Sequence, residues 1–257
     1  KRGLEHGKHL LIEKPLADNA RDASELVDLA HKNNLTLMVD HTFIYSGAVQ
    51  KIREIIRNNE LGEVWYVDSV RINLGIFQQD VNVVWDLAPH DISILDYLID
   101  AEPISVSATG LAPASYTDNS LEGIAYVTVR YDNSVLAHLH LSWLSPLKIR
   151  RMIIGGSRKL LVYDHLDQDH QVKIYDKGVE MITEGKRHKL LGERREGDMH
   201  APKVDQSEPL ERVCNHFIQC ISNSEKPITD GNSGLKVVRI IEAAIQSMKT
   251  GGGAVSL

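Results

Sequence analysis

The chain has 257 residues, 42% of them hydrophobic and 25% charged, which is typical of a globular protein with one large domain or one and a half smaller ones. Its formal net charge is −6 and its basic residues are scattered, so the clustered basic surface of a nucleic-acid-binding protein is not expected. No apolar run approaches the roughly 20 residues that cross a membrane. The two cysteines, Cys214 and Cys220, lack the spacing of a metal site and favour a reduced, cytoplasmic protein.

The first forty residues predict a strand, a helix and a second strand. Lys8–Ile12 is a short apolar run bounded by turn signals, as in a buried parallel strand. Asp18 or Asn19 can cap a helix that runs to about Asn33, and the apolar run Leu35–Val39 follows. This order predicts a right-handed parallel crossover.

Ligands of open parallel sheets bind just beyond the carboxyl ends of the strands. Glu13 and Lys14 follow the first predicted strand, and Asp40 and His41 follow the second, so we expect a functional edge there. Pro15 pushes Lys14 towards extended geometry, and a cis Lys14–Pro15 bond would mark a functional turn. The alternative is that Lys14 is a solvated loop residue.

The rest of the chain predicts a helix at Ser46–Asn59 and then a sheet, because several segments alternate apolar and polar residues. These segments are Val64–Ile76, Ser105–Leu111, Gly123–Tyr131, Val135–Trp143, Arg150–Gly155 and Lys159–Tyr163. We expect a further hairpin around Val172–Ile182, a long surface loop that includes the charged stretch Lys186–Glu196, and helices at Glu208–Asn223 and Gly234–Thr250.

Val84–Asp100 predicts a helix that places Asp86 and His90 on one face, with their Cβ atoms about 6 Å apart. Pro89 is tolerated if it falls in the first turn, and Asp86 would then lie near the N-cap. One interpretation is that the helix presents both side chains to a ligand. The other is that Asp86 only caps the helix and His90 is only a structural histidine.

A lysine at a strand end and an Asp/His pair can together move the proton of an alcohol. An imidazole has an unperturbed pKa of about 6.5 and suits a general base at neutral pH. An ammonium near the substrate oxygen stabilises developing alkoxide charge, and the hydride must then pass to a bound acceptor.

Four segments resemble the glucose–fructose oxidoreductase/inositol dehydrogenase (Gfo/Idh/MocA) family. HLLIEKPLA at 9–17 is similar to its Glu-Lys-Pro signature, and WDLAPHDISIL at 85–95 resembles its Asp-x-x-x-His motif. NNELGEVWYVDSVRI at 58–72 and SWLSPLKIRRMIIGGSRKLLVYD at 142–164 resemble the link into its large sheet and the sheet itself.

The resemblance implies an α/β remnant of a Rossmann fold, followed by an α+β domain with a large, mostly antiparallel, open sheet. We expect the first part to cover residues 1–44 and the substrate-binding and oligomerisation domain to cover 45–257. No G-x-G-x-x-G turn is present, so we expect an N-terminally truncated member that lacks the pyrophosphate contacts.

The resemblance also implies the site. Lys14 would contact the nicotinamide ribose and the substrate hydroxyl, Asp86 would orient the substrate, and His90 would be the acid/base. The cofactor, NAD or NADP, would further contact Glu13, Pro15, His41 and Trp85. An anionic substrate would meet Lys148, Arg150 and Arg151, although an alternating strand sends only part of this set to one face. We expect no metal.

The leading hypothesis is an NAD(P)-dependent dehydrogenase of a CH–OH group in a sugar, sugar nucleotide or cyclitol. One alternative is an NAD-retaining glycoside hydrolase of the same family. Another is a cofactor-incompetent fragment that only assembles through its sheet. A homodimer or homotetramer through that sheet is expected, with Val127, Val129, Leu139 and Leu141 facing outward.

Overall fold

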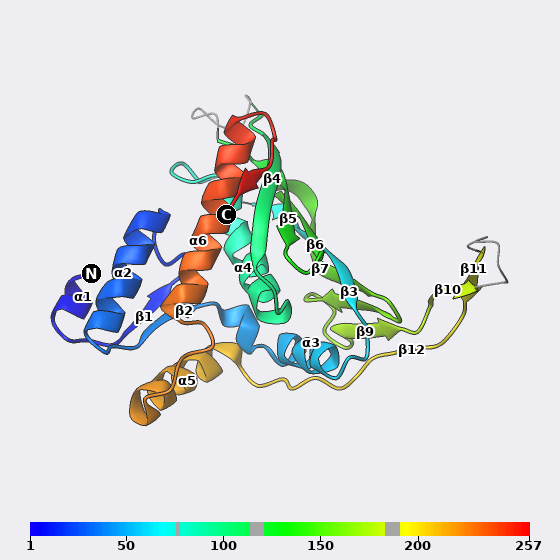
Figure 1. The fold of residues 1–257 in the computed structure, drawn as a ribbon, viewed down its shortest axis with the longest axis horizontal. Helices are drawn as coiled ribbons and strands as arrows, with labels where there is room; N and C mark the ends of the chain where they lie inside the picture. The colour runs from blue at the N-terminus through cyan, green and yellow to red at the C-terminus, as the bar shows by residue number, and fades with distance from the viewer. Residues whose placement is uncertain (76–77, 114–120, 183–190) are drawn as a thin grey trace.

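The computed structural model describes residues 1–75, 78–113, 121–182 and 191–257. Figure 1 shows a small strand–helix unit beside a large twisted sheet, and a two-stranded hairpin that extends away from the body. The described helices lie on one side of the large sheet. None of them is both long enough and apolar enough to cross a membrane.

The chain begins with the predicted strand–helix–strand. After the short helix α1 (Arg2–Glu5), strand β1 (Leu10–Glu13) pairs in parallel with β2 (Leu37–Asp40), and α2 (Ala20–Lys32) connects them. Asn19 caps α2, because its side chain accepts from the amide of Asp22. The register places Glu13 beside Asp40 at the carboxyl ends of the two strands.

The large sheet has nine strands in the order β12-β9-β8-β7-β3-β6-β5-β4-β13. Strand β3 pairs in parallel with β6, and the other pairs are antiparallel, as the sequence predicts. The strands run over β3 Val64–Leu74, β4 Pro103–Leu111, β5 Ile124–Tyr131, β6 Leu136–Ser142, β7 Leu144–Gly156, β8 Leu160–Asp164, β9 Val172–Tyr175, β12 Met199–His200 and β13 Val255–Ser256.

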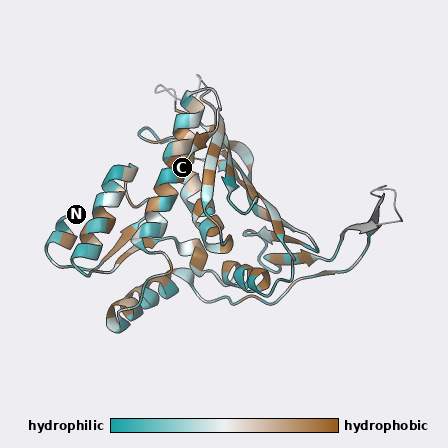
Figure 2. Cartoon of the chain, in the orientation of Figure 1, coloured by the Kyte–Doolittle hydropathy of each residue, from teal (hydrophilic) through white to brown (hydrophobic). Residues whose placement is uncertain are grey.

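The predicted outward positions of this sheet are wrong. Val127, Val129, Leu139 and Leu141 are fully buried in the main core, on the face that the helices cover. The alternate residues, such as Tyr126 and His140, lie on the other face, and Figure 2 shows this change of hydropathy along the strands. The alternation of apolar and polar residues predicts that the two faces of the sheet differ. The helices cover the apolar face, so these four residues are buried.

Helices α3 (Gly47–Arg57), α4 (Val83–Leu98) and α6 (Gly231–Lys249) supply the other side of the core. The 3-10 helix η1 (Thr42–Tyr45) leads into α3, and α5 (Pro209–Asn223) packs against η1. Helix α6 contacts α2, β2 and β4, so it joins the strand–helix unit to the large sheet.

The predicted hairpin at Val172–Ile182 is also wrong. Strand β9 pairs with β8 and β12, whereas β10 (Gly178–Ile182) pairs with β11 (Leu191–Arg195) in a separate sheet. The segment expected as a charged loop at Lys186–Glu196 therefore contains a strand, and its residues 186–190 lie outside the described part.

Candidate active site

Lys14 follows β1 and reaches the start of α4, 72 residues further along the chain. The Lys14–Pro15 bond is cis, as the sequence suggested. The Nζ of Lys14 donates to the backbone carbonyl oxygen of Asp86 at 2.9 Å and lies 3.8 Å from its Oδ1. The end of a strand and the first turn of a helix therefore meet at one ammonium group.

Asp86 receives a second contact from the sheet. The indole Nε1 of Trp143, at the end of β6, donates to Asp86 Oδ2 at 2.9 Å, and Trp143 is 1% exposed. Asp86 thus joins the strand–helix unit to the large sheet through one carboxylate.

Asp86 is not the helix cap that the sequence suggested. Asn82 caps α4, since its side chain accepts from the amides of Val84 and Trp85. The helix begins at Val83, which puts Asp86 in the first turn and Pro89 inside the helix instead of in its first turn. The asparagine lies before the segment that the sequence assigned to the helix.

His90 lies one turn beyond Asp86, and its ring packs edge-on to Phe43 with 5.0 Å between the ring centres. Its Nδ1 is buried and has no hydrogen-bond partner among the described residues. Burial, and then the charges of Arg71 and Lys14, lower the pKa of His90 to about 2. The imidazole is therefore neutral at neutral pH, and its buried Nδ1 is not engaged by another described residue.

His41, between β2 and η1, is the second histidine near Lys14. It is 1% exposed, and neither ring nitrogen has a partner in the described chain. Burial and the nearby charge of Lys14 lower the pKa of His41 to about 4. Lys14 contacts Asp86, one helical turn before His90, and its charge acts on both imidazoles, so the three side chains lie in one neighbourhood.

The other residues predicted to contact the cofactor are Glu13, Pro15 and Trp85, which are less buried than His41. Glu13 is exposed at the end of β1, and Pro15 is half-buried. Trp85 is half-buried and packs against both the main core and the core of the strand–helix unit. It therefore lies where these two cores meet.

An ion pair that the sequence analysis missed lies behind His90. Arg71 of β3 forms a bidentate pair with Asp91 of α4, at 2.7 Å from Nε to Oδ2 and 2.9 Å from Nη2 to Oδ1. Both side chains are buried, and the Arg71 guanidinium also lies over the ring of Phe43 at 4.8 Å. Two features of the sequence could have indicated this pair: a charged residue at an inward strand position, and an aspartate next to His90.

The three cationic side chains predicted to bind the substrate, Lys148, Arg150 and Arg151, do not all lie on one face of β7. Strand β7 pairs Arg150 with Arg71 of β3, so Arg150 lies on the helix-covered side and Lys148, two residues away, shares its face of the strand. Arg151 lies on the alternate side and donates from Nη2 to Asp164 at 2.8 Å. The charge of Arg150 also contributes to the low pKa of His90.

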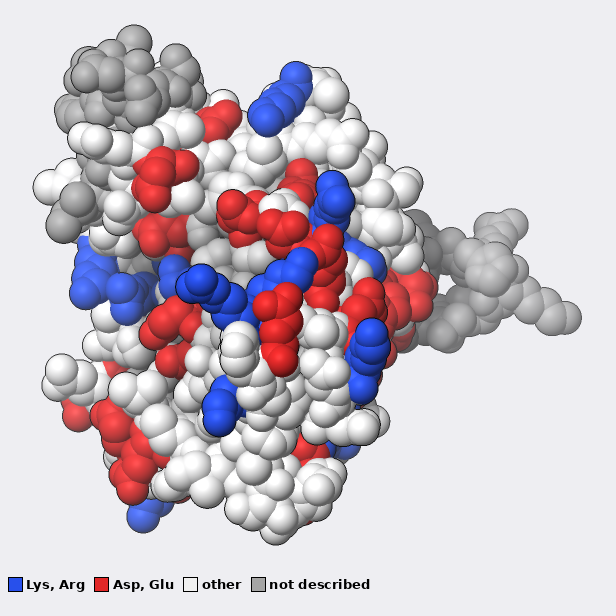
Figure 3. All heavy atoms as spheres, turned by 90° about the vertical axis from the view of Figure 1, so that its left-hand side faces the viewer, with Lys and Arg blue, Asp and Glu red and all other residues white. Residues whose placement is uncertain are grey.

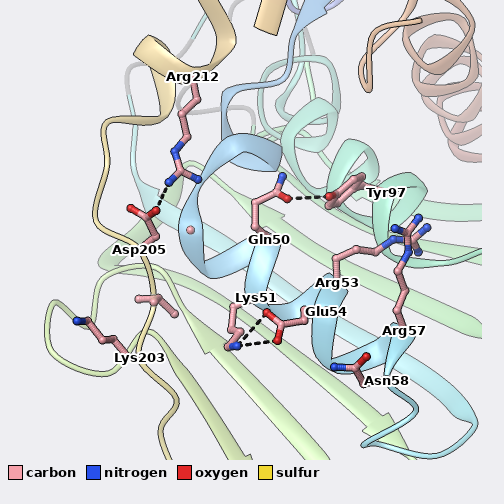
Figure 4. A pocket seen from close by; sticks show the side chains of 12 residues that line it. Gln50, Lys51, Arg53, Glu54, Arg57, Asn58, Tyr97, Lys203, Asp205 and Arg212 are labelled. Atoms are coloured by element: carbon pink, nitrogen blue, oxygen red, sulfur yellow. Dashed lines mark hydrogen bonds and ion pairs between the residues drawn. The ribbon is translucent and has the colours of Figure 1, made fainter. Parts of the chain in front are cut away.

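A separate polar pocket of about 590 Å³ lies against α3, and Figure 4 shows its lining. It is lined by cations and carboxylates such as Lys51, Glu54, Asp205 and Arg212, several of which pair with one another. None of the predicted site residues lines it. On the face shown in Figure 3, basic and acidic side chains are interspersed.

Comparison with known families gives two matches along the chain. Residues 1–41 match the family described as "Oxidoreductase family, NAD-binding Rossmann fold", and residues 49–162 match the GFO/IDH/MocA C-terminal domain. Together the two matches cover more than half of the chain and include Lys14, Asp86 and His90.

Similar proteins of known activity or structure span nearly the whole chain. UDP-N-acetylglucosamine 3-dehydrogenase of Acidithiobacillus ferrooxidans is 27% identical over 246 residues, which are 95% of this chain and 71% of that protein. Its solved structure has a TM-score of 0.79 at 23% identity and covers 97% of this chain and 74% of its own. An oxidoreductase from Agrobacterium radiobacter, solved with NAD+, L-tartaric acid and magnesium, has a TM-score of 0.77 at 15% identity, with 99% and 74% coverage.

Proposed function

Because the chain belongs to the GFO/IDH/MocA oxidoreductase family, we propose that it is an NAD(P)-dependent dehydrogenase of a CH–OH group in a sugar, sugar nucleotide or cyclitol. The observation that supports this most is the meeting of Lys14, Asp86 and His90 from β1 and α4. The similar UDP-N-acetylglucosamine 3-dehydrogenase supports the sugar class.

The residues around β1 and β2 fit the nicotinamide end of NAD or NADP. Glu13, Lys14 and Pro15 follow one parallel strand and His41 follows the other, at the edge where such sheets bind ligands. His41 is buried at this edge with ring nitrogens that have no partner among the described residues, and the half-buried Trp85 provides an aromatic surface. When bound, the nicotinamide accepts the hydride of the oxidised carbon.

His90 takes the proton of the substrate hydroxyl in this proposal. Its imidazole is neutral over the physiological range, because its pKa is low. The Lys14 ammonium donates to the substrate oxygen and stabilises the negative charge that develops as the proton leaves. Asp86, held by Trp143, fixes the position of that ammonium.

The test replaces the base and keeps the rest of the site. His90→Gln should lower NADH formation at least about 100-fold, the lower range for general-base removal, while binding of NAD by calorimetry stays unchanged. His170→Gln, at an exposed histidine, should leave both unchanged. Equal turnover in His90→Gln would refute the assignment, and redox-neutral sugar release without NADH would identify the glycoside hydrolase.

We also propose that copies of the chain associate through the sheet face that carries Tyr126, His138 and His140. Tyr126 is 40% exposed and stacks on His140 with 4.6 Å between the ring centres. Ordered, exposed aromatic side chains of this kind are enriched at protein interfaces.

We propose that the chain divides into residues 1–44 and 45–257. The family matches support this division, because one ends at residue 41 and the other begins at residue 49.

A further inference from the structure

Arg150 occupies a position where two guanidinium groups face one carboxylate. The β3–β7 register sets Arg150 opposite Arg71, and Asp91 lies beside them on α4. Both oxygens of Asp91 accept from Arg71. Asp91 therefore satisfies Arg71 and leaves Arg150 without a direct carboxylate.

The guanidinium of Arg150 is half-buried and lacks any ion pair in the described part of the chain. Its Nε is buried and has no hydrogen-bond partner there. The next residue, Arg151, is more exposed and is paired with Asp164. A partly desolvated cation without a partner is costly, and proteins keep such groups where a ligand supplies the missing charge.

The groups that face Arg150 are mostly cationic or neutral. Arg71 carries positive charge, and burial followed by the charges of Arg150, Arg71 and Lys148 lowers the pKa of His165. Asp91 and Tyr163 are the acidic groups close enough to affect Arg150, and Asp91 is already occupied by Arg71. The surroundings therefore favour an added negative charge.

We propose, on the basis of the dehydrogenase function above, that the substrate is a sugar bearing an oxyanion, either a carboxylate or a phosphate, and that Arg150 binds this oxyanion beside His90. A guanidinium presents a planar fork that matches either group with two parallel hydrogen bonds. Lys148, on the same face of β7, supplies a second charge at the more exposed end.

An anion at this position also helps the chemistry of His90. Arg150 is one of the charges that keep the imidazole from accepting a proton. Neutralising that charge raises the pKa of His90 and makes it a better base once the substrate is bound. The substrate would thus activate the group that deprotonates it.

The experiment is calorimetric titration of the chain, without cofactor, with pairs of anionic and neutral sugars. N-acetylglucosamine 1-phosphate is compared with N-acetylglucosamine, and glucuronate with glucose. We expect at least one anionic member to bind at least about 10-fold more tightly than its neutral partner, as a charge-assisted hydrogen bond implies. The pair that shows the difference identifies phosphate or carboxylate. Equal affinity in both pairs would overturn the proposal, as would absence of binding.

Variants assign the preference to Arg150. Arg150→Gln should weaken binding of the preferred anion about 10- to 100-fold, and Arg150→Lys, which keeps the charge, should lose less. Arg21→Gln, at a side chain of α2 that is 88% exposed, is the matched control and should bind as the unmodified chain does. Unchanged affinity in a folded Arg150→Gln protein would overturn the proposal. If that variant does not fold, unchanged affinity of Arg150→Lys for the preferred anion would overturn it, because a lysine cannot form the two parallel hydrogen bonds.

The same titrations separate this proposal from the dehydrogenase function. Anion-selective binding without NADH formation after NAD is added would favour the cofactor-incompetent alternative over the dehydrogenase and leave the oxyanion site standing. NADH formation from neutral sugars, unaffected by Arg150→Gln, would refute the oxyanion site alone.

Discussion

At the scale of single residues, the proposed site contains two imidazoles that are kept neutral. His41 is buried and His90 is partly buried, and Lys14 lies close enough to lower the pKa of each. Burial is the larger cause in both, because an apolar environment disfavours the charged form. A lysine and two uncharged histidines can therefore occupy one small region without mutual repulsion.

The low pKa of His41 predicts acid instability. The unfolded chain binds a proton at this residue near pH 6.5, and the folded chain does so only near pH 4. Stability should therefore fall as the pH drops from 6.5 to 4, by up to about 1.4 kcal/mol per pH unit for one such group. Urea unfolding at several pH values measures this slope, and His41→Gln should flatten it. An unchanged slope in the variant would contradict the prediction.

Lys14→Met removes the ammonium and keeps most of the side-chain volume. We expect a loss of turnover of about 100- to 1,000-fold, the range for removing one stabilising donor. The pKa of His41 should rise towards its ordinary value, because the lysine charge is gone. NADH formation and NMR titration of the imidazoles check the two outcomes. Lys32→Met, at an exposed residue of α2, is the control, and a pKa shift there would undermine the interpretation.

At the scale of elements, periodicity predicted most helices and strands but not the side-chain contacts between them. The apolar spacing in α2 and α3 and the alternation in β5 and β6 are local properties, and the structure contains these elements. The pairing of Arg71 with Asp91 depends on how β3 lies against α4, which no local pattern contains. The residues near Lys14 were predictable only because strand ends and a family motif pointed to them.

The Arg71–Asp91 pair should be the costliest ion pair to break. Asp91→Ala leaves a buried guanidinium unpaired, which costs about 3–5 kcal/mol of unfolding free energy. Glu54→Ala removes the partner of Lys51 at an exposed pair, which is worth about 0–1 kcal/mol. Chemical denaturation of both variants measures the difference. Similar losses would show that the buried pair has little structural role.

The approach of residues 203–205 to α3 depends on Gly47. A Cβ at Gly47 would collide with the backbone carbonyl of Asp205, which cannot move as a flexible side chain can. Gly47→Ala should therefore lower stability by about 1–3 kcal/mol, the usual cost of overpacking. Gly253→Ala meets no atom within 4 Å and serves as the control. Thermal unfolding compares the two, and equal melting temperatures would refute the close contact.

At the scale of the whole molecule, one helix holds the two halves together. Helix α6 places Leu235 and Val238 in the core of the strand–helix unit and Ile241 and Ala244 in the core under the large sheet. Figure 1 shows it standing between them. The relative position of Lys14 and His90 is therefore fixed by packing as well as by their own contacts.

The open sheet face predicts the assembly state. Tyr126→Arg should convert an oligomer to monomers, because it places a charge at the proposed interface. Leu210→Arg, at a somewhat more exposed apolar residue on α5, should leave assembly unchanged. Sedimentation velocity measures both. A monomeric unmodified chain at micromolar concentration would contradict the proposal.

The position of Arg150 on a strand and of His90 on a helix has a consequence for engineering. The groups proposed to react lie just after β1 and on α4, whereas the residues proposed to select the substrate are carried by β7. A designer could therefore graft a different stretch at 147–151 to change the compounds accepted, and leave the redox machinery untouched. The same separation would let natural variants change their substrate range by substitutions in a single strand.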